Sequence, residues 1–258
     1  MAISPNMMAG LSLSELCIED CMVAEQVSFG KTGSVASVLN ILASAPNLKA
    51  FTWILDRNGR HAHALPAKRS NEIPGRAALL CLRRLVLHAP VETIAYIFSS
   101  VSLPLNCHLD LGTTINCETV NIALVKQSLR DTVGEQLYAA PRIAQFTQLS
   151  LRNAENESGI LMHWSNAHDP PPGWSQDFRM AITPIQSLAT DEPPLAISDI
   201  CTCIMEWEPL RASITLLEIA VPWFYTRHAN DGNQRDKMWA AAVQRLPQPV
   251  DVKDLVTA

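Results

Sequence analysis

The clearest feature of the chain is a short alternation of apolar and polar residues that recurs along it. In the first copy, from Leu13 to Val23, the residues fit the repeat pattern L-x-x-L-x-L-x-x-C-x-L. Leu16 and Ile18 are two positions apart, so a short strand would point both to one side while Glu19 points to the other. This spacing predicts a strand with one buried and one open face.

The same kernel recurs along the chain, and the recurrence is more informative than any single copy. Eight kernels begin at residues 16, 51, 85, 109, 149, 180, 217 and 250, with a mean step of about 33 residues. That step is longer and looser than in regular leucine-rich repeats. The recurrence predicts one strand per repeat.

Between the kernels the apolar period changes from two to about 3.6, which is typical of helices. We expect Ile122, Val125 and Leu129 to face inward in the longest of these segments. Prolines follow several segments and mark their ends. The predicted helical segments are 35–42, 94–101, 118–138, 197–204 and 239–246.

Strand, connection, helix and a new strand form the unit of an α/β solenoid, in which each repeat buries its apolar face on its neighbours. We therefore expect residues 1–258 to form a single irregular leucine-rich-repeat solenoid, with a curved parallel sheet on the concave side and helices on the convex side. Polar loop insertions are expected near 57–76 and 152–177, the second as an irregular hairpin and loop on one rim. The alternative is a doubly wound α/β domain, whose buried strands usually have continuous apolar runs instead of this alternation.

Composition limits the partners and the compartment. Apolar residues make up 48% of the 258 residues and charged residues 17%, which indicates a globular chain. A net charge of −5 gives no basic surface for nucleic acid, and no stretch is apolar enough to cross a membrane. Seven cysteines without framework spacing favour a reducing compartment, the cytoplasm or the nucleus.

The chain contains fragments of catalytic and metal-binding motifs, but none is complete. Gly30-Lys31-Thr32 resembles the end of a phosphate-binding loop, yet Glu25 stands where its first glycine belongs. His61 and His63 have no second pair of ligands nearby. We therefore expect no catalytic residue, no cofactor and no metal, and a protein that is not an enzyme. A small α/β enzyme with a non-motif active site remains the alternative, built from scattered histidines: His88, His108, His163, His168 and His228.

Two junctions carry a resemblance to a known family. Residues 43–53, ASAPNLKAFTW, look like a recurrent L-x-x-x-P-x-L-x-x-L-x-L junction, and residues 239–252, WAAAVQRLPQPVDV, look like a closing helix before a last strand. In these stretches the chain resembles the leucine-rich region of the fungal F-box-associated proteins. The F-box of that family, which docks its members onto a ubiquitin-ligase scaffold, is absent from the sequence before Leu11.

The resemblance implies a module that binds a protein partner, with substrate recognition for a ubiquitin ligase as its setting. In a solenoid of this kind the residues beside the inward leucines line the concave face. The expected partner-binding residues are Glu19, Thr52, His88, Asp110, Arg152 and Glu218. A non-functional truncated paralogue is a further alternative.

Overall fold

The nine long strands form one sheet in which most neighbours are parallel. The computed structural model describes residues 13–19, 35–54, 77–104, 107–117, 121–138, 146–154, 159–166, 177–184, 195–220, 234–247 and 251–254. The order across the sheet is β1-β2-β4-β6-β9-β8-β7-β10-β11. Only β8 runs antiparallel to its neighbours. The strands are β1 (Glu15–Glu19), β2 (Ala50–Ile54), β4 (Arg84–His88), β6 (His108–Ile115), β7 (Gln148–Asn153), β8 (Ile160–Ser165), β9 (Phe178–Pro184), β10 (Leu216–Ala220) and β11 (Asp251–Asp254).

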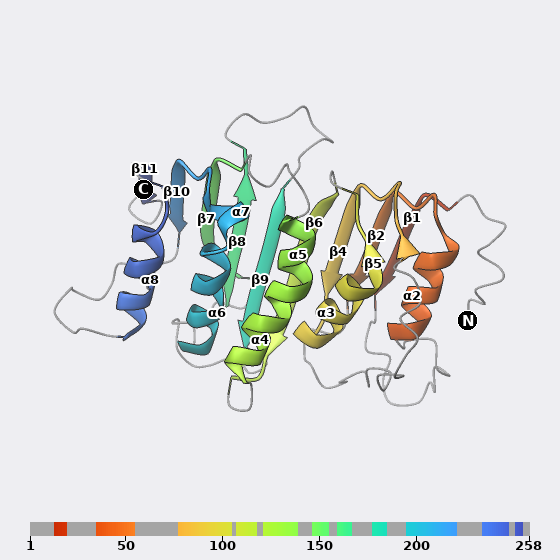
Figure 1. The fold of residues 1–258 in the computed structure, drawn as a ribbon, viewed down its shortest axis with the longest axis horizontal. Helices are drawn as coiled ribbons and strands as arrows, with labels where there is room; N and C mark the ends of the chain where they lie inside the picture. The colour runs from red at the N-terminus through yellow and green to blue at the C-terminus, as the bar shows by residue number, and fades with distance from the viewer. Residues whose placement is uncertain are drawn as a thin grey trace.

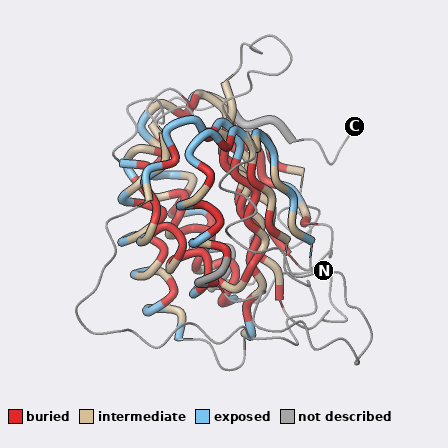
Figure 2. Tube along the Cα trace, turned by 90° about the vertical axis from the view of Figure 1, so that its right-hand side faces the viewer, coloured by how far each residue is buried: buried red, intermediate tan, exposed pale blue. Residues whose placement is uncertain are grey.

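The described helices form one layer against a single face of this sheet (Figure 1). Seen along the sheet, helices and strands are two separate layers with the buried residues between them (Figure 2). We call the opposite side of the sheet the helix-free face. The helices are α2 (Val35–Ser44), α3 (Val91–Ser100), α4 (Ile122–Leu129), α5 (Glu135–Tyr138), α6 (Leu195–Met205), α7 (Glu208–Arg211) and α8 (Gln234–Gln244). A small parallel pair, β3 (Ala77–Ala78) with β5 (Val101–Ser102), completes the described elements.

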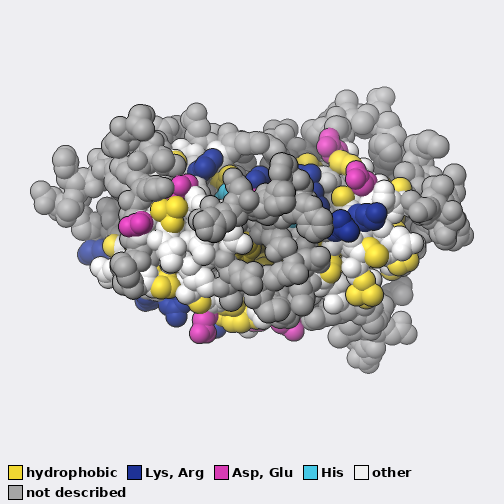
Figure 3. Space-filling view, turned by 90° about the horizontal axis from the view of Figure 1, so that it is seen from above, with side chains coloured by type: hydrophobic (Ala, Val, Ile, Leu, Met, Phe, Trp, Pro, Cys, Tyr) yellow, Lys and Arg dark blue, Asp and Glu magenta, His cyan; other side chains and the backbone are white. Residues whose placement is uncertain are grey.

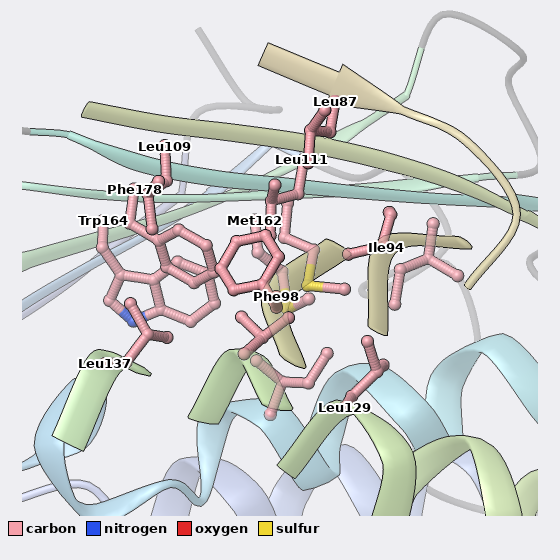
Figure 4. Close-up of a cluster of buried hydrophobic side chains, with 14 of the residues drawn as sticks. Leu87, Ile94, Phe98, Leu109, Leu111, Leu129, Leu137, Met162, Trp164 and Phe178 are labelled. Carbon is pink, nitrogen blue, oxygen red and sulfur yellow. The ribbon is translucent and has the colours of Figure 1, made fainter. Parts of the chain in front are cut away.

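Alternation along the strands divides each of them between the core and the helix-free face. On β2, Phe51 and Trp53 are buried while Thr52 between them is partly exposed. The strand register aligns the inward residues into two rows that cross the sheet. Figure 4 shows how these rows pack against the helices: Leu87, Leu109, Leu111, Met162, Trp164 and Phe178 lie on the strand side, and Ile94, Phe98, Leu129 and Leu137 on the helix side.

The predicted elements match the observed ones closely. Each of the eight kernels overlaps a strand of the sheet, and each predicted helical segment overlaps a helix. The segment 118–138 contains α4, a π-helical turn η1 (Arg130–Gly134) and α5 without interruption. Asn121 caps this run, since its side-chain oxygen accepts a hydrogen bond from the backbone N–H of Leu124 at 3.2 Å. Val125 and Leu129 are buried as expected, and Ile122 is half-buried.

The middle of the sheet departs from the prediction of strands stacked in chain order. After β6 the chain passes over two strand positions to β7, returns through β8 to β9, and then crosses again to β10. The stretch 152–177 therefore holds a central strand, β8, and its hairpin with β7 lies inside the sheet instead of on a rim. The reason is its apolar alternation: Ile160, Met162 and Trp164 all fill the core.

Candidate functional site

The helix-free face carries a cluster of histidine, aspartate and arginine side chains at the middle of the sheet. The register places them beside one another, because they lie at outward positions on β4, β6, β9 and β8 or, for Asp177, directly before β9. Figure 3 looks down on the end of the sheet where the parallel strands begin, and it shows basic and histidine side chains gathered near the middle. We call this set the central cluster: His88, His108, Asp110, His163, Asp177 and Arg179.

Two histidine–aspartate contacts organise the central cluster. Nε2 of His88 lies 3.4 Å from Oδ1 of Asp110, and Nε2 of His163 lies 3.2 Å from Oδ2 of Asp177. The second contact has the distance of an ion pair but is not aligned as a hydrogen bond. Arg179 approaches the same carboxylate, with a terminal nitrogen 3.5 Å from Oδ2 of Asp177. Each aspartate is therefore in contact with a basic side chain of a neighbouring strand.

These contacts shift the pKa values of both carboxyl groups. Burial alone would raise the pKa of Asp110, but the hydrogen bond and charge of His88 outweigh it and hold that pKa below its usual value. The pKa of Asp177 is lowered mainly by His163, against the opposing effect of burial. Both side chains are thus held as carboxylates near neutral pH.

His108 lies at the same centre but prefers to be neutral. Burial lowers the pKa of its imidazole, and the nearby charges of Asp177 and Asp110 oppose this without reversing it. Its Nδ1 atom is buried and has no hydrogen-bond partner within the described part of the chain, and the same holds for Nε of Arg179. Such atoms are costly to leave unpaired, so this centre is a place where the fold gives up stability.

The six residues predicted to bind a partner all lie at outward positions of the sheet. His88 and Asp110 are in contact with each other. Arg152 is exposed and its Nε donates a hydrogen bond to Oγ of Ser150 at 3.0 Å. The other three stand apart from this centre, Glu19 on β1, Thr52 on β2 and Glu218 on β10. The structure thus brings one pair together and spreads the rest across the face.

Asp177 and Arg179 of the central cluster were not proposed from the sequence, and His108 and His163 were named only among the scattered histidines of the alternative enzyme. His108 stands two residues before Asp110, and a period of two puts both on one side of a strand. The same alternation applies to Arg179 beside Met180. His163 could be found only by recognising β8, because it lies between the buried Met162 and Trp164.

Five of the six described cysteines have thiol pKa values raised above the usual value. Burial raises the pKa of the Cys107 thiol to about 12 and also raises that of Cys201 and Cys117. The pKa values of Cys17 and Cys203 are raised as well, again chiefly through burial. A reactive cysteine needs a lowered pKa, so none of these five thiols is an activated nucleophile.

Several expected features can be placed only in part. Among the described residues no group of three or more His, Cys, Asp or Glu has the arrangement of a metal site. None of the described helices is both long and apolar enough to cross a bilayer. Gly30-Lys31-Thr32, His61, His63 and the loop near 57–76 lie outside the described residues.

Comparisons with protein-family models, with curated proteins and with solved structures found no matching protein.

Proposed function

We propose that this chain is a non-catalytic interaction module, built as an irregular leucine-rich-repeat solenoid, that holds a protein partner on its helix-free face. The observation that carries the proposal is the one-sided packing of the sheet, since the described helices cover one face (Figure 2). Polar side chains alternate onto the other face, as on β2 and β9. A doubly wound domain would need helices on both faces. A sheet face that none of the described helices covers, with charged side chains on it, is the surface that such modules offer to partners.

The composition of the face supports a protein partner. Its outward positions mix charged, polar and small residues, for example Thr52, Asp110 and Ala181 on neighbouring parts of the sheet. A protein surface can match such a mixed pattern through many moderate contacts. The net charge of −5 argues against nucleic acid.

The resemblance to the fungal F-box-associated proteins suggests the biological setting. In that setting the chain would recognise a substrate for a ubiquitin ligase, in the cytoplasm or the nucleus. A direct test is whether affinity capture of the chain from its native cells recovers a ligase scaffold.

The binding face is tested by charge reversal. Glu19→Lys, Arg152→Glu and Glu218→Lys are expected to abolish capture of the partner while leaving the melting temperature within about 2 °C, since these side chains are not core residues. Matched reversals in the helix layer, Glu92→Lys and Arg130→Glu, are expected to leave capture intact. Loss of capture through the helix-layer set, with the sheet set still active, would overturn the proposal.

A small α/β enzyme is the second candidate, favoured by the two histidine–aspartate contacts of the central cluster. Such pairs can serve as general bases. Against this candidate, the thiols of Cys107 and Cys201 have raised pKa values and are poor nucleophiles. If His88→Gln and His163→Gln abolished a turnover reaction while capture of a partner persisted, the enzyme would replace the interaction module.

A further inference from the structure

Three arginines on the helix-free face lie along one diagonal of the strand register. This arrangement indicates which kind of partner segment the face binds. They are Arg84 on β4, Arg179 on β9 and Arg152 on β7. The inference rests on the proposed function and adds the chemistry of the partner to it.

The register fixes the line. Arg84 is paired with His108 on β6, and Asp110, two residues further along β6, is paired with Arg179. Arg179 therefore lies two strands across and one outward row down from Arg84. Strands are about 4.8 Å apart and outward rows about 6.7 Å apart, so the step is about 12 Å.

The step from Arg179 to Arg152 has the same geometry as the step from Arg84 to Arg179. Arg179 is paired with His163 on β8, which is paired with Ser150 on β7. Arg152 lies two residues beyond Ser150, again two strands across and one row down. The three arginines are thus evenly spaced along one diagonal of the sheet.

The guanidinium groups on this diagonal are accessible, and their charges are not fully paired with carboxylates of the described residues. Arg84 is exposed and is not paired with any carboxylate of the described residues. Arg152 is exposed, and among the described residues its side chain donates through Nε to Ser150. Arg179 keeps 43% of its side chain exposed, and its contact with Asp177 at 3.5 Å is long for a bidentate pair.

The surroundings make this diagonal the basic part of an otherwise acidic face. Asp110 and Asp177 are engaged by histidines. Glu15 and Glu19 on β1 and Glu218 on β10 flank the middle of the sheet on both sides. The charges therefore select a ligand that is acidic where it crosses the centre.

We propose that the partner presents an extended acidic segment whose carboxylates, at positions i, i+4 and i+8, pair with Arg84, Arg179 and Arg152. An extended chain advances about 3.3 Å per residue, so four residues span about 13 Å, close to one step of the diagonal. The spacing has to be even because only alternate side chains of an extended segment face the same surface. Arginine binds carboxylate through two parallel N–H···O bonds, which gives the pairing its direction.

The test is selection of peptides on the purified full chain from a display library with 16 random positions. The expected result is enrichment of peptides with Asp or Glu at i, i+4 and i+8. Synthetic copies are then measured by fluorescence anisotropy beside permuted peptides of equal composition with acids at i, i+3 and i+5. The permuted peptides are expected to bind about a hundredfold more weakly, because only one of their three acids can then meet an arginine and two charged pairs are lost.

Variants of the chain locate the peptide. Arg84→Gln, Arg179→Gln and Arg152→Gln are each expected to weaken the selected peptide about tenfold, and Arg130→Gln in the helix layer is expected to change nothing. Enriched peptides that depend on the sheet arginines but lack the acidic spacing would overturn this inference and leave the proposed function standing. Selected peptides that bind the helix layer would contradict both. A selection that yields no peptide above background would overturn this inference alone, since capture of a folded partner tests the function separately.

Discussion

The imidazole of His88 lies directly against Gly112 on the neighbouring strand. A Cβ atom at residue 112 would stand 2.9 Å from both Cγ and Cδ2 of the His88 ring, closer than such atoms approach. Glycine at this position therefore leaves the space in which the ring reaches Asp110. The contact between His88 and Asp110, 3.4 Å long, depends on a missing side chain across the strand pair.

The first prediction follows from this relationship. Gly112→Ala is expected to displace the His88 ring and so let the pKa of Asp110 rise toward its usual value, because the hydrogen bond and charge of His88 are what lower it. The free energy of unfolding should fall by about 1–3 kcal/mol, as expected for overpacking. Titration of the Asp110 carboxyl by NMR measures the shift.

A matched glycine in the helix layer serves as its control. A Cβ at Gly134 would have its nearest neighbours at 3.7–3.8 Å, which is ordinary contact. Gly134→Ala is expected to leave the Asp110 titration unchanged and to stabilise the chain by about 0.4–1 kcal/mol. An unchanged Asp110 pKa in Gly112→Ala would contradict the assigned role of the glycine.

The second prediction concerns acidification. The folded chain lowers the pKa of His108, so between that value and the usual 6.5 the unfolded chain binds more protons. Stability should therefore be complete above pH 6.5 and fall as the pH drops below it. Urea unfolding of the chain and of His108→Gln between pH 7.5 and 5 measures this, and the variant is expected to have the smaller slope.

At lower pH, protonation of two carboxylates adds a second loss of stability. Asp110 and Asp177 have lowered pKa values, so each contributes stability that is present above the usual value of 3.8 and is lost as the pH falls through the folded value. Asp177→Asn should reduce the loss of stability below pH 3.8, and it should make the slope near pH 6 steeper, because the charge of Asp177 raises the pKa of His108. A His108→Gln variant with the same slope as the parent above pH 5 would refute the buried, neutral histidine.

The third prediction separates the two faces of one strand. Phe51 is fully buried and Thr52 beside it is only partly so. Phe51→Ala is expected to cost about 3–5 kcal/mol through loss of contacts and a residual cavity, and Thr52→Ala about 0.5 kcal/mol or less. Equal losses in urea unfolding would mean that the alternation does not divide core from open face.

The fourth prediction tests the strand order at the centre. Leu161 on β8 is paired with Ala181 on β9 in the antiparallel register. Paired residues have Cα atoms about 4.5–5.5 Å apart, within the range of a disulfide. The double variant Leu161→Cys/Ala181→Cys should form a disulfide on mild oxidation, seen by peptide mass spectrometry.

The control shifts the register by two residues. Leu161→Cys/Thr183→Cys places the two Cα atoms about 8 Å apart, too far for a bridge without movement of the backbone. Cross-linking in the shifted pair but not in the aligned one would show that β8 does not lie beside β9 in this register.

The alternation in the sequence was sufficient to locate most elements, since each kernel needs only local residues to reveal its inward pair. Leu85 and Leu87, for instance, both prove to be core residues. The strand order was not accessible, because it depends on which strands pair over long range. β8 alternates as clearly as the kernels do, but it lies in a stretch rich in proline, asparagine and serine that favoured a loop.

The central cluster, too, could be predicted only in part, because it depends on which strands pair. His88 and Asp110 could be proposed because each flanks an inward leucine in its own kernel. Their contact with each other, and the approach of His163 to Asp177, require the pairing of β4 with β6 and of β8 with β9. Four residues of the cluster come together only through that pairing.

Binding of a protein partner on the helix-free face is tested most directly by site-specific photo-cross-linking in the native cells. A photoreactive residue is placed at Thr52 or Glu218 on the helix-free face, and at Glu92 or the 61% exposed Leu124 in the helix layer. The account predicts that the two sheet positions cross-link one and the same protein and that the helix positions do not. Cross-links that arise from Glu92 and Leu124, with none from Thr52 and Glu218, would contradict it.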